Sequence, residues 1–245
     1  MNLANVKIYF RQFGFLHSLK FLISVFFQRV LDPHRIASYS QGAEDRIIRS
    51  ILGNTQNGYY VDVGCNDPQR FSNTFALYRQ GWSGINIDAN QYLIGKHRRL
   101  KKRDISVCAV VSDQEQEVIF TEFNDSLVSS IDAKQVDKWK GRREIKRQTK
   151  LKTVSLNEIL EEYNAPKFFD LLSIDVEGHD FEVLCSIDLA TYRPKLIVVE
   201  MHGLDISELP KSTIYQYLAS HNYGLVGYIR PNSYFVDKLC RKEDN

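Results

Sequence analysis

The sequence predicts a doubly wound α/β domain whose mostly parallel sheet ends in an antiparallel hairpin. From residue 40 onward, apolar runs of five to seven residues alternate with amphipathic stretches, and this rhythm is typical of βαβ units. Most of these runs are continuously apolar, as in strands that are buried on both faces. Only residues 230–232 separate the last two runs, and so short a connection predicts a hairpin.

The individual strands and helices follow from these runs. The predicted strands are Tyr59–Val63, Gly84–Asp88, Ile105–Val111, Val118–Phe123, Phe169–Asp175, Leu196–Met201, Gly224–Ile229 and Ser233–Val236. The predicted helices are Gly42–Leu52, Ser72–Gln80, Gln91–Lys101, Leu156–Tyr163, Phe181–Leu189 and Ser212–Ser220. Ser155 and Glu158 have the spacing of a capping box for the fourth helix. The basic segment 132–152 is predicted as a solvated loop or helix face, with a patch for an anionic substrate as the alternative.

Composition sets the protein class. With 245 residues, of which 43% are hydrophobic, the chain can form one packed domain and a short extension. Thirty-two Lys and Arg against thirty Asp and Glu leave a net charge of +2, which argues against a nucleic-acid partner. The four cysteines form no Cys-x-x-Cys pair, and no secretory signal is evident, so we expect reduced thiols and a cytoplasmic protein.

Residues 1–39 are predicted to be an amphipathic helical extension of the domain formed by residues 40–245. Apolar side chains crowd residues 15–31, but Lys20 and Arg29 leave only residues 21–28 free of charge. A membrane span needs about 20 apolar residues, so this segment is too short. We expect the helix to cover its own domain or the partner in a homodimer, with peripheral contact to the inner membrane through residues 15–31 as the alternative.

A cofactor site is predicted where the first strand ends. Asp62, Gly64 and Asn66 lie there, and a glycine lets the backbone approach a ligand closely. Dinucleotide-binding loops carry two further glycines, but Asn66 and Gln69 occupy those positions, which disfavours a pyrophosphate cofactor. Asp88 ends the second strand, where an acidic side chain accepts hydrogen bonds from ribose hydroxyls. The pattern therefore favours a zwitterionic nucleoside such as S-adenosyl-L-methionine.

A second group of ionisable residues lies at or just after the carboxyl ends of the predicted strands Phe169–Asp175 and Leu196–Met201. These candidate catalytic residues are Asp175, Glu177, His179, Glu200 and His202. Burying unpaired charge is costly, so we expect these side chains to face a cleft, where His179 or His202 acts as a general base. The same oxygen and imidazole groups suit a divalent metal, Mg²⁺ or Mn²⁺. Two alternatives remain. The two histidines could only cap helix or strand ends, or the chain could be an inactive nucleoside-binding or membrane-associated scaffold with the same fold.

Five ordered motifs carry a family resemblance. They are Ser40–Asp45 (SQGAED), Val61–Gly64 (VDVG), Gly81–Asp88 (GWSGINID), Ile174–Asp180 (IDVEGHD) and Val198–Glu200 (VVE). From about Ser40 to Gly203 the chain resembles the FkbM-like family of S-adenosylmethionine-dependent methyltransferases, which often has Glu in place of Asp88 and Asp180. The resemblance implies a Rossmann-like class I methyltransferase fold and donor contacts at Asp62, Gly64, Asn66 and Asp88. It also suggests that Gln41, Glu44 and Asp45 line the site or brace its entrance.

The resemblance also implies a reaction. Members of this family usually methylate the hydroxyl group of a sugar or a polyketide. We therefore expect an O-methyltransferase that acts on a carbohydrate or glycolipid acceptor in cell-surface polysaccharide or related glycan biosynthesis.

Overall fold

The computed structural model describes residues 15, 16, 18–20, 23, 38–53, 55–201 and 203–240. The chain divides into two units, Met1–Ala37 and Ser38–Asn245, and the fold given below is that of the second unit. Most of the amphipathic helix predicted over residues 15–31 lies outside the described residues, so its packing or membrane contact stays a prediction. Among the described residues, no helix is long and apolar enough to cross a membrane.

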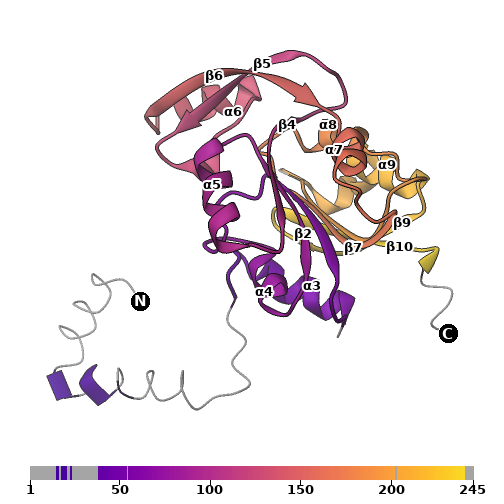
Figure 1. Ribbon diagram of the computed structural model, residues 1–245, viewed down its shortest axis with the longest axis horizontal. Helices are drawn as coiled ribbons and strands as arrows, with labels where there is room; N and C mark the ends of the chain where they lie inside the picture. The colour runs from indigo at the N-terminus through magenta and orange to yellow at the C-terminus, as the bar shows by residue number, and fades with distance from the viewer. Residues whose placement is uncertain are drawn as a thin grey trace. The chain divides into compact units, whose positions relative to one another are not determined.

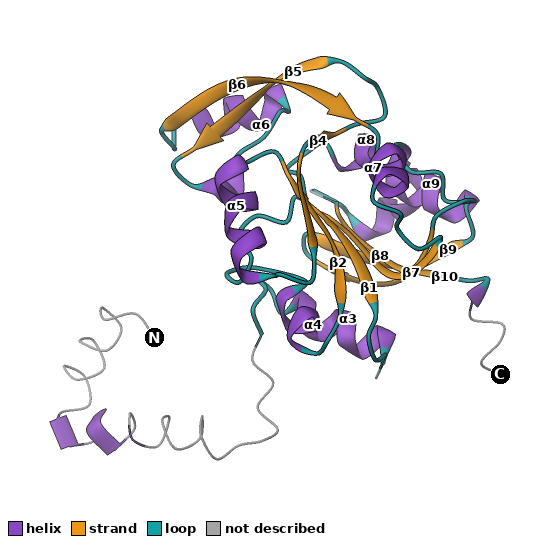
Figure 2. Ribbon diagram, viewed as in Figure 1, coloured by secondary structure: helices purple, strands orange, loops and turns teal. Residues whose placement is uncertain are grey.

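A sheet forms the centre of the domain (Figure 2). It has seven strands in the order β3-β2-β1-β7-β8-β10-β9. Its strands are β1 (Tyr59–Val63), β2 (Ser83–Asp88), β3 (Ile105–Cys108), β7 (Phe168–Ile174), β8 (Arg193–Glu200), β9 (Tyr223–Ile229) and β10 (Asn232–Asp237). The pairs from β3 to β8 are parallel, whereas β10 is antiparallel to both β8 and β9. This arrangement confirms the predicted Rossmann-like α/β fold with its terminal hairpin.

Helices cover both faces of this sheet, as Figure 2 shows. They are α3 (Glu44–Leu52), α4 (Phe75–Arg79), α5 (Gln91–Leu100), α7 (Leu156–Glu162), α8 (Asp180–Cys185) and α9 (Thr213–Ser220), with a 3-10 helix, η2 (Ile206–Lys211). Successive strand residues point to opposite faces. Val61 accordingly packs in the cluster that contains side chains of α7, α8 and α9, and Tyr60 packs in the cluster that contains Ile48 of α3 and Leu77 of α4. The predicted capping box of α7 is present, and α4 and α8 are shorter than predicted.

A second, three-stranded sheet has the order β4-β6-β5. It consists of β4 (Val110–Val111), β5 (Glu117–Phe123) and β6 (Ile145–Val154), and η1 (Ser126–Val128) and α6 (Ala133–Lys140) lie between the last two strands in sequence. We call residues 117–154 the cap. Figure 1 shows β5, β6 and α6 gathered at one end of the main sheet.

The cap corrects two predictions. The single strand predicted over Ile105–Val111 is divided at Ala109, because β3 pairs in the main sheet whereas β4 pairs with β6. The segment 132–152, predicted as a loop or helix face, contains both α6 and most of β6. In β6, the partly buried Leu151 and the buried Thr153 alternate with exposed lysines, as in a strand with one face in water.

Candidate active site

A cavity of about 490 Å³ lies between the main sheet and the cap. It is lined by residues at the carboxyl ends of β1, β2, β7 and β8 and by cap residues such as Ser126 and Trp139. The chain order reverses between β1 and β7, and open α/β sheets bind ligands at such a switch point. Nine of the ten predicted site residues line this cavity: Gln41, Asp62, Gly64, Asn66, Asp88, Asp175, Glu177, His179 and Glu200. His202 lies outside the described residues.

Gly64 brings the loops after β1 and β7 into direct contact. Its φ is +79°, and a Cβ atom there would lie 1.7 Å from the Asp175 carbonyl oxygen. The Asp175 N–H donates to the Val63 carbonyl oxygen (3.0 Å), and the Gly64 N–H donates to the Ile87 carbonyl oxygen (2.9 Å). A side chain at position 64 would therefore force the two loops apart, which explains the glycine physically.

Asp88 and Asn66 meet beside this glycine. The Asp88 carboxylate accepts hydrogen bonds from the backbone N–H groups of Asn66 (2.9 Å) and Asn90 (2.7 Å). Burial nevertheless raises the pKa of Asp88 to about 6. A carboxylate oxygen can accept a second hydrogen bond, so ribose hydroxyls fit here. The Asn66 side chain is directed toward the cap, because its Oδ1 accepts a hydrogen bond from Ser126 Oγ (3.0 Å).

Asp62 belongs to a buried polar network beneath the cavity. Its Oδ2 accepts a hydrogen bond from Thr74 Oγ1 (2.7 Å). The fully buried Lys101 donates to Thr74 Oγ1 (2.7 Å) and to Asn86 Oδ1 (2.9 Å). Burial raises the pKa of Asp62, and the positive charge of Lys101 opposes that shift. Asp62 thus holds the end of β1 in place while it lines the cavity.

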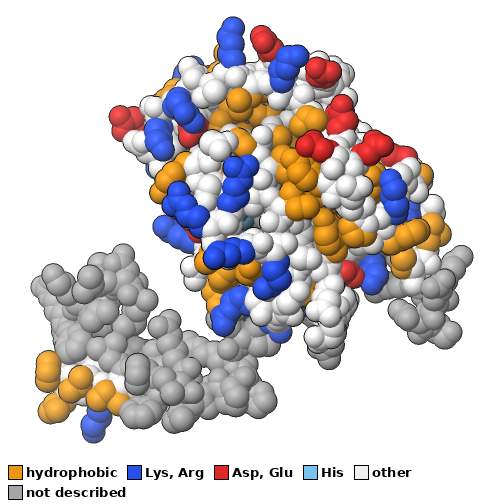
Figure 3. Space-filling model, in the orientation of Figure 1, with side chains coloured by type: hydrophobic (Ala, Val, Ile, Leu, Met, Phe, Trp, Pro, Cys, Tyr) orange, Lys and Arg blue, Asp and Glu red, His pale blue; other side chains and the backbone are white. Residues whose placement is uncertain are grey.

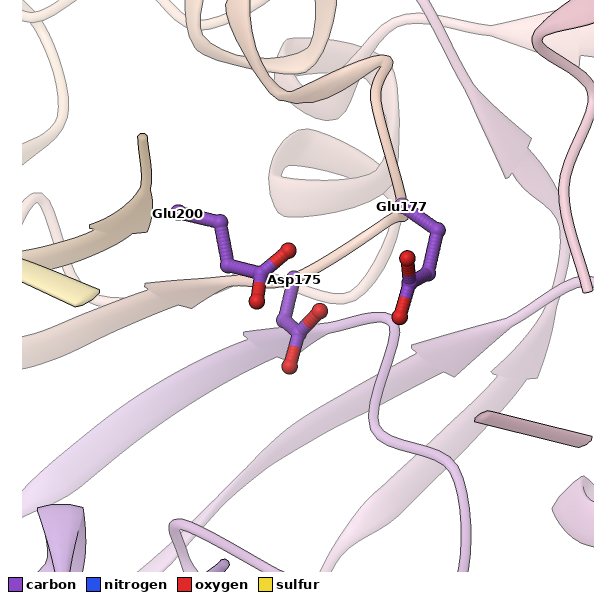
Figure 4. Close-up of side chains that lie close together, drawn as sticks. All are labelled: Asp175, Glu177 and Glu200. Carbon is purple, nitrogen blue, oxygen red and sulfur yellow. The ribbon is translucent and has the colours of Figure 1, made fainter. Parts of the chain in front are cut away.

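Three carboxylates form an acidic cluster in the cavity. One ligand oxygen from each of Asp175, Glu177 and Glu200 lies within 4.8 Å of the others, and Figure 4 shows the three side chains close together. Asp175 and Glu177 follow β7, and Glu200 ends β8. Burial, followed by the negative charges of Glu200, Asp180 and Glu177, raises the pKa of Asp175 well above its usual value. Such a cluster can accept a proton or bind a divalent cation.

His179 lines the cavity, but both of its ring nitrogens have partners elsewhere. Its Nε2 lies 3.0 Å from Ser112 Oγ, and its Nδ1 lies 3.5 Å from the Glu182 carboxylate. Asp180 braces the same loop by accepting hydrogen bonds from the N–H groups of Val176 and Gly178, both at 3.1 Å. His179 is therefore held by contacts to Ser112 and Glu182, and its role as the general base stays a prediction.

The other side of the acidic cluster is formed by residues that sequence reasoning missed or only partly placed. Glu44 accepts hydrogen bonds from the Gly42 N–H (2.7 Å) and from Asn232 Nδ2 (3.1 Å). Asn232 is buried, faces Glu200 across the β8–β10 register and lines the cavity. Its Oδ1 has no hydrogen-bond partner among the described residues. The sequence analysis placed Asn232 in the connection 230–232, whereas it is the first residue of β10, and no sequence signal singled it out.

The chain was compared with known proteins and with protein-family models. One similar solved structure is a TehB-like S-adenosylmethionine-dependent methyltransferase from Corynebacterium glutamicum ATCC 13032 Kitasato, with 12% identity and a TM-score of 0.40 over 97% of this chain and 100% of the other. No curated protein matches the sequence. The model of the methyltransferase FkbM domain matches residues 62–225, which is more than half of the chain. The chain therefore belongs to the FkbM family of S-adenosylmethionine-dependent methyltransferases.

Proposed function

We propose that this protein transfers the methyl group of S-adenosyl-L-methionine to a sugar hydroxyl in cell-surface polysaccharide or related glycan biosynthesis. The observation that carries the proposal is that the acidic cluster and the predicted donor loop line one cavity. S-adenosylmethionine supplies an electrophilic methyl group on a positively charged sulfur. The chain must then hold a hydroxyl oxygen in line with that group and remove its proton.

The acidic cluster supports deprotonation of the acceptor. A carboxylate becomes a stronger base as its pKa rises toward neutral pH, and the pKa of Asp175 is raised well above its usual value. In the proposed step the acceptor oxygen forms a bond to the methyl carbon while the bond from that carbon to sulfur breaks. The hydroxyl proton passes to the cluster, and S-adenosylhomocysteine leaves with a neutral sulfur.

Asn232 supports a hydroxyl-bearing acceptor. Its amide orientation is fixed because Nδ2 donates to the Glu44 carboxylate, so Oδ1 is the atom left to accept a hydrogen bond. Buried polar atoms nearly always have a partner, and a hydroxyl is a donor that could fill this place. The carboxylates of Glu44 and Glu200 line the same part of the cavity, which favours an acceptor with several hydroxyl groups.

A divalent metal fits the same cluster. Mg²⁺ and Mn²⁺ prefer hard carboxylate oxygens, and Asp175, Glu177 and Glu200 would hold the ion. Such an ion would supply Lewis-acid activation of the acceptor hydroxyl. It would also offset the repulsion between these carboxylates, which adds to the effect of burial in raising the pKa of Asp175. We propose this as an optional component of the site.

Donor binding should depend on pH through Asp88. The ionised carboxylate accepts hydrogen bonds from ribose, and its pKa is about 6, so the competent form decreases as the pH falls through that value. We expect the affinity for S-adenosylmethionine to fall about tenfold between pH 7 and pH 5, as measured by calorimetric titration. Asp88→Asn should bind weakly and with no such dependence. Wild-type affinity that stays constant over this range would contradict the role of Asp88.

Transfer itself is tested with radiolabelled S-adenosylmethionine and a panel of sugars and glycosides, with Mg²⁺, with Mn²⁺ and with EDTA. We expect a methyl ether product whose rate of formation falls at least about 100-fold in Glu200→Gln. Glu161→Gln, at an exposed site outside the cavity, serves as the matched control and should be unaffected. If the folded protein binds the donor but methylates no hydroxyl, the inactive-scaffold alternative replaces this proposal.

A further inference from the structure

Three exposed cations line the cavity that holds the acidic cluster. Lys138 belongs to α6, Arg143 lies between α6 and β6, and Arg230 lies in the turn between β9 and β10. Because these side chains are exposed and yet line the cavity, they lie at its opening. We infer that they bind a phosphate group of the acceptor, so that the substrate is a phosphate-bearing sugar. This inference rests on the proposed function and specifies its substrate class.

Two of the three cations at the opening are not paired with a nearby acid among the described residues. Arg143 lies 3.4 Å from Asp125, but Lys138 and Arg230 form no ion pair with any described residue. Residues 124–152 contain nine Lys and Arg against four Asp and Glu, although the whole chain carries only +2. Figure 3 shows Lys and Arg side chains gathered over the region of α5 and the cap. A local excess of positive charge attracts anionic ligands.

Trp139 adds an aromatic surface between two of these cations. Lys138 Nζ lies 5.3 Å from the indole ring centroid and Arg143 Cζ lies 5.5 Å from it. The ring lines the cavity, and its buried Nε1 has no partner among the described residues. Indole groups combine an apolar face with an N–H donor that usually finds a partner. A sugar ring can pack on such a face while its phosphate contacts the neighbouring cations.

The distribution of charge fixes the orientation of the acceptor. Asp175, Glu177 and Glu200 would repel an anion, whereas Lys138, Arg143 and Arg230 would attract one. The phosphate would therefore remain at the opening, and a hydroxyl would reach the acidic cluster. Arg side chains bind phosphate oxygens through two N–H groups at once. After Asp125 is counted against Arg143, the three cations leave an excess of two positive charges, which is more than a single carboxylate needs and matches the charge of a phosphate group.

The experiment separates binding from transfer. Binding is measured by titrating the complex with S-adenosylhomocysteine with UDP-glucose, with GDP-mannose and with a polyprenyl-diphosphate-linked glucose in micelles. The affinity for each ligand is compared with the affinity for the corresponding free sugar. We expect at least one phosphate-bearing ligand to bind about tenfold or more tightly than its free sugar, and less tightly as salt is added. The nucleotide and lipid ligands distinguish two sources of the same phosphate chemistry.

Variants of the three cations test whether these side chains cause the difference in affinity between phosphate-bearing and free sugars. Arg143→Gln, Arg230→Gln and Lys138→Gln should each weaken binding of the phosphate-bearing ligand about 5- to 10-fold. The affinities for the free sugar and for S-adenosylmethionine should not change. Arg142→Gln is the matched control, because Arg142 is exposed and adjacent in sequence but does not line the cavity.

Each outcome decides one of the two proposals. Equal affinity for the phosphate-bearing and free sugars would overturn the inference, even if free sugars were methylated and the proposed function held. Weaker donor binding in all three variants would also overturn it, by assigning the cations to the methionine carboxylate. Cation-dependent binding of a phosphate-bearing sugar, without methylation of any hydroxyl, would instead uphold the anion site and overturn the proposed function.

Discussion

Replacing Asp175 by Asn is expected to stabilise the protein while it removes most of the catalytic activity. Asp175 has a raised pKa because it is buried beside other carboxylates, so an amide of the same shape relieves that repulsion. We expect a gain of about 1 kcal/mol in the free energy of unfolding, which corresponds to roughly 2–4 °C in melting temperature for a chain of this size. Turnover should fall at least about 100-fold.

The pH dependence of this gain gives a further check. Because the pKa of Asp175 is raised from 3.8, the folded wild type binds more protons than the unfolded chain above that pH. Wild-type stability should therefore decrease as the pH rises from about 3.8 toward the raised pKa of Asp175 in the folded protein. The advantage of Asp175→Asn should be small near pH 4 and should grow toward neutral pH, as measured by thermal unfolding. If Asp175→Asn were less stable than the wild type at pH 7.5, Asp175 would not be destabilised by repulsion from the neighbouring carboxylates.

Replacing Lys101 by Met should have the largest effect on stability. Lys101 is fully buried, and its charge opposes the pKa increases that burial imposes on Asp62 and Asp104. Without that charge, the buried Asp62 and the half-buried Asp104 lose their compensating cation, and the loss of such a cation typically costs about 3–5 kcal/mol. We expect a loss of this size in urea unfolding. Donor affinity should fall as well, because the network holds the end of β1.

Lys102→Met is the matched control, since Lys102 is the next residue and is exposed. Its effect should stay within about 0.5 kcal/mol. Adding Asp104→Asn to Lys101→Met should restore part of the lost stability, because one uncompensated carboxylate is removed. If Lys101→Met and Lys102→Met were equally stable, the buried network would not contribute to stability as described.

The residues predicted to bind the donor line one cavity for a physical reason. Carboxyl ends of parallel strands meet at one edge of a sheet, so a polar residue after each apolar run is brought near the others. Asp88 and Glu200 are far apart in sequence but line the same cavity. Strand limits were also close, since β1 matches its predicted range and β2 begins one residue earlier than predicted.

Strand β6 and the buried position of Lys101 were not predicted, because neither has a local pattern in the sequence that indicates it. Strand β6 carries many charged residues, and its alternation is visible only when its partner β5 is known. Lys101 stands in a basic stretch with Lys102 and Arg103, and nothing in that pattern distinguishes the buried lysine from its exposed neighbours. Only tertiary packing distinguishes Lys101. Helix α5 ends where the Lys101 side chain can donate hydrogen bonds to Thr74 and Asn86.

The reversed direction of β10 has a consequence for how this enzyme could change its substrate. Because β10 runs against β8, its first residue, Asn232, and the turn before it reach the edge where the parallel strands end. Under the proposed function, contacts to the acceptor would be made by this hairpin turn, whereas contacts to the donor would be made by the crossover loops after β1 and β2. Substitutions at Arg230 and Asn232 could therefore redirect acceptor choice without rebuilding the donor pocket. New specificities within such a scaffold could evolve through a few exchanges in one turn.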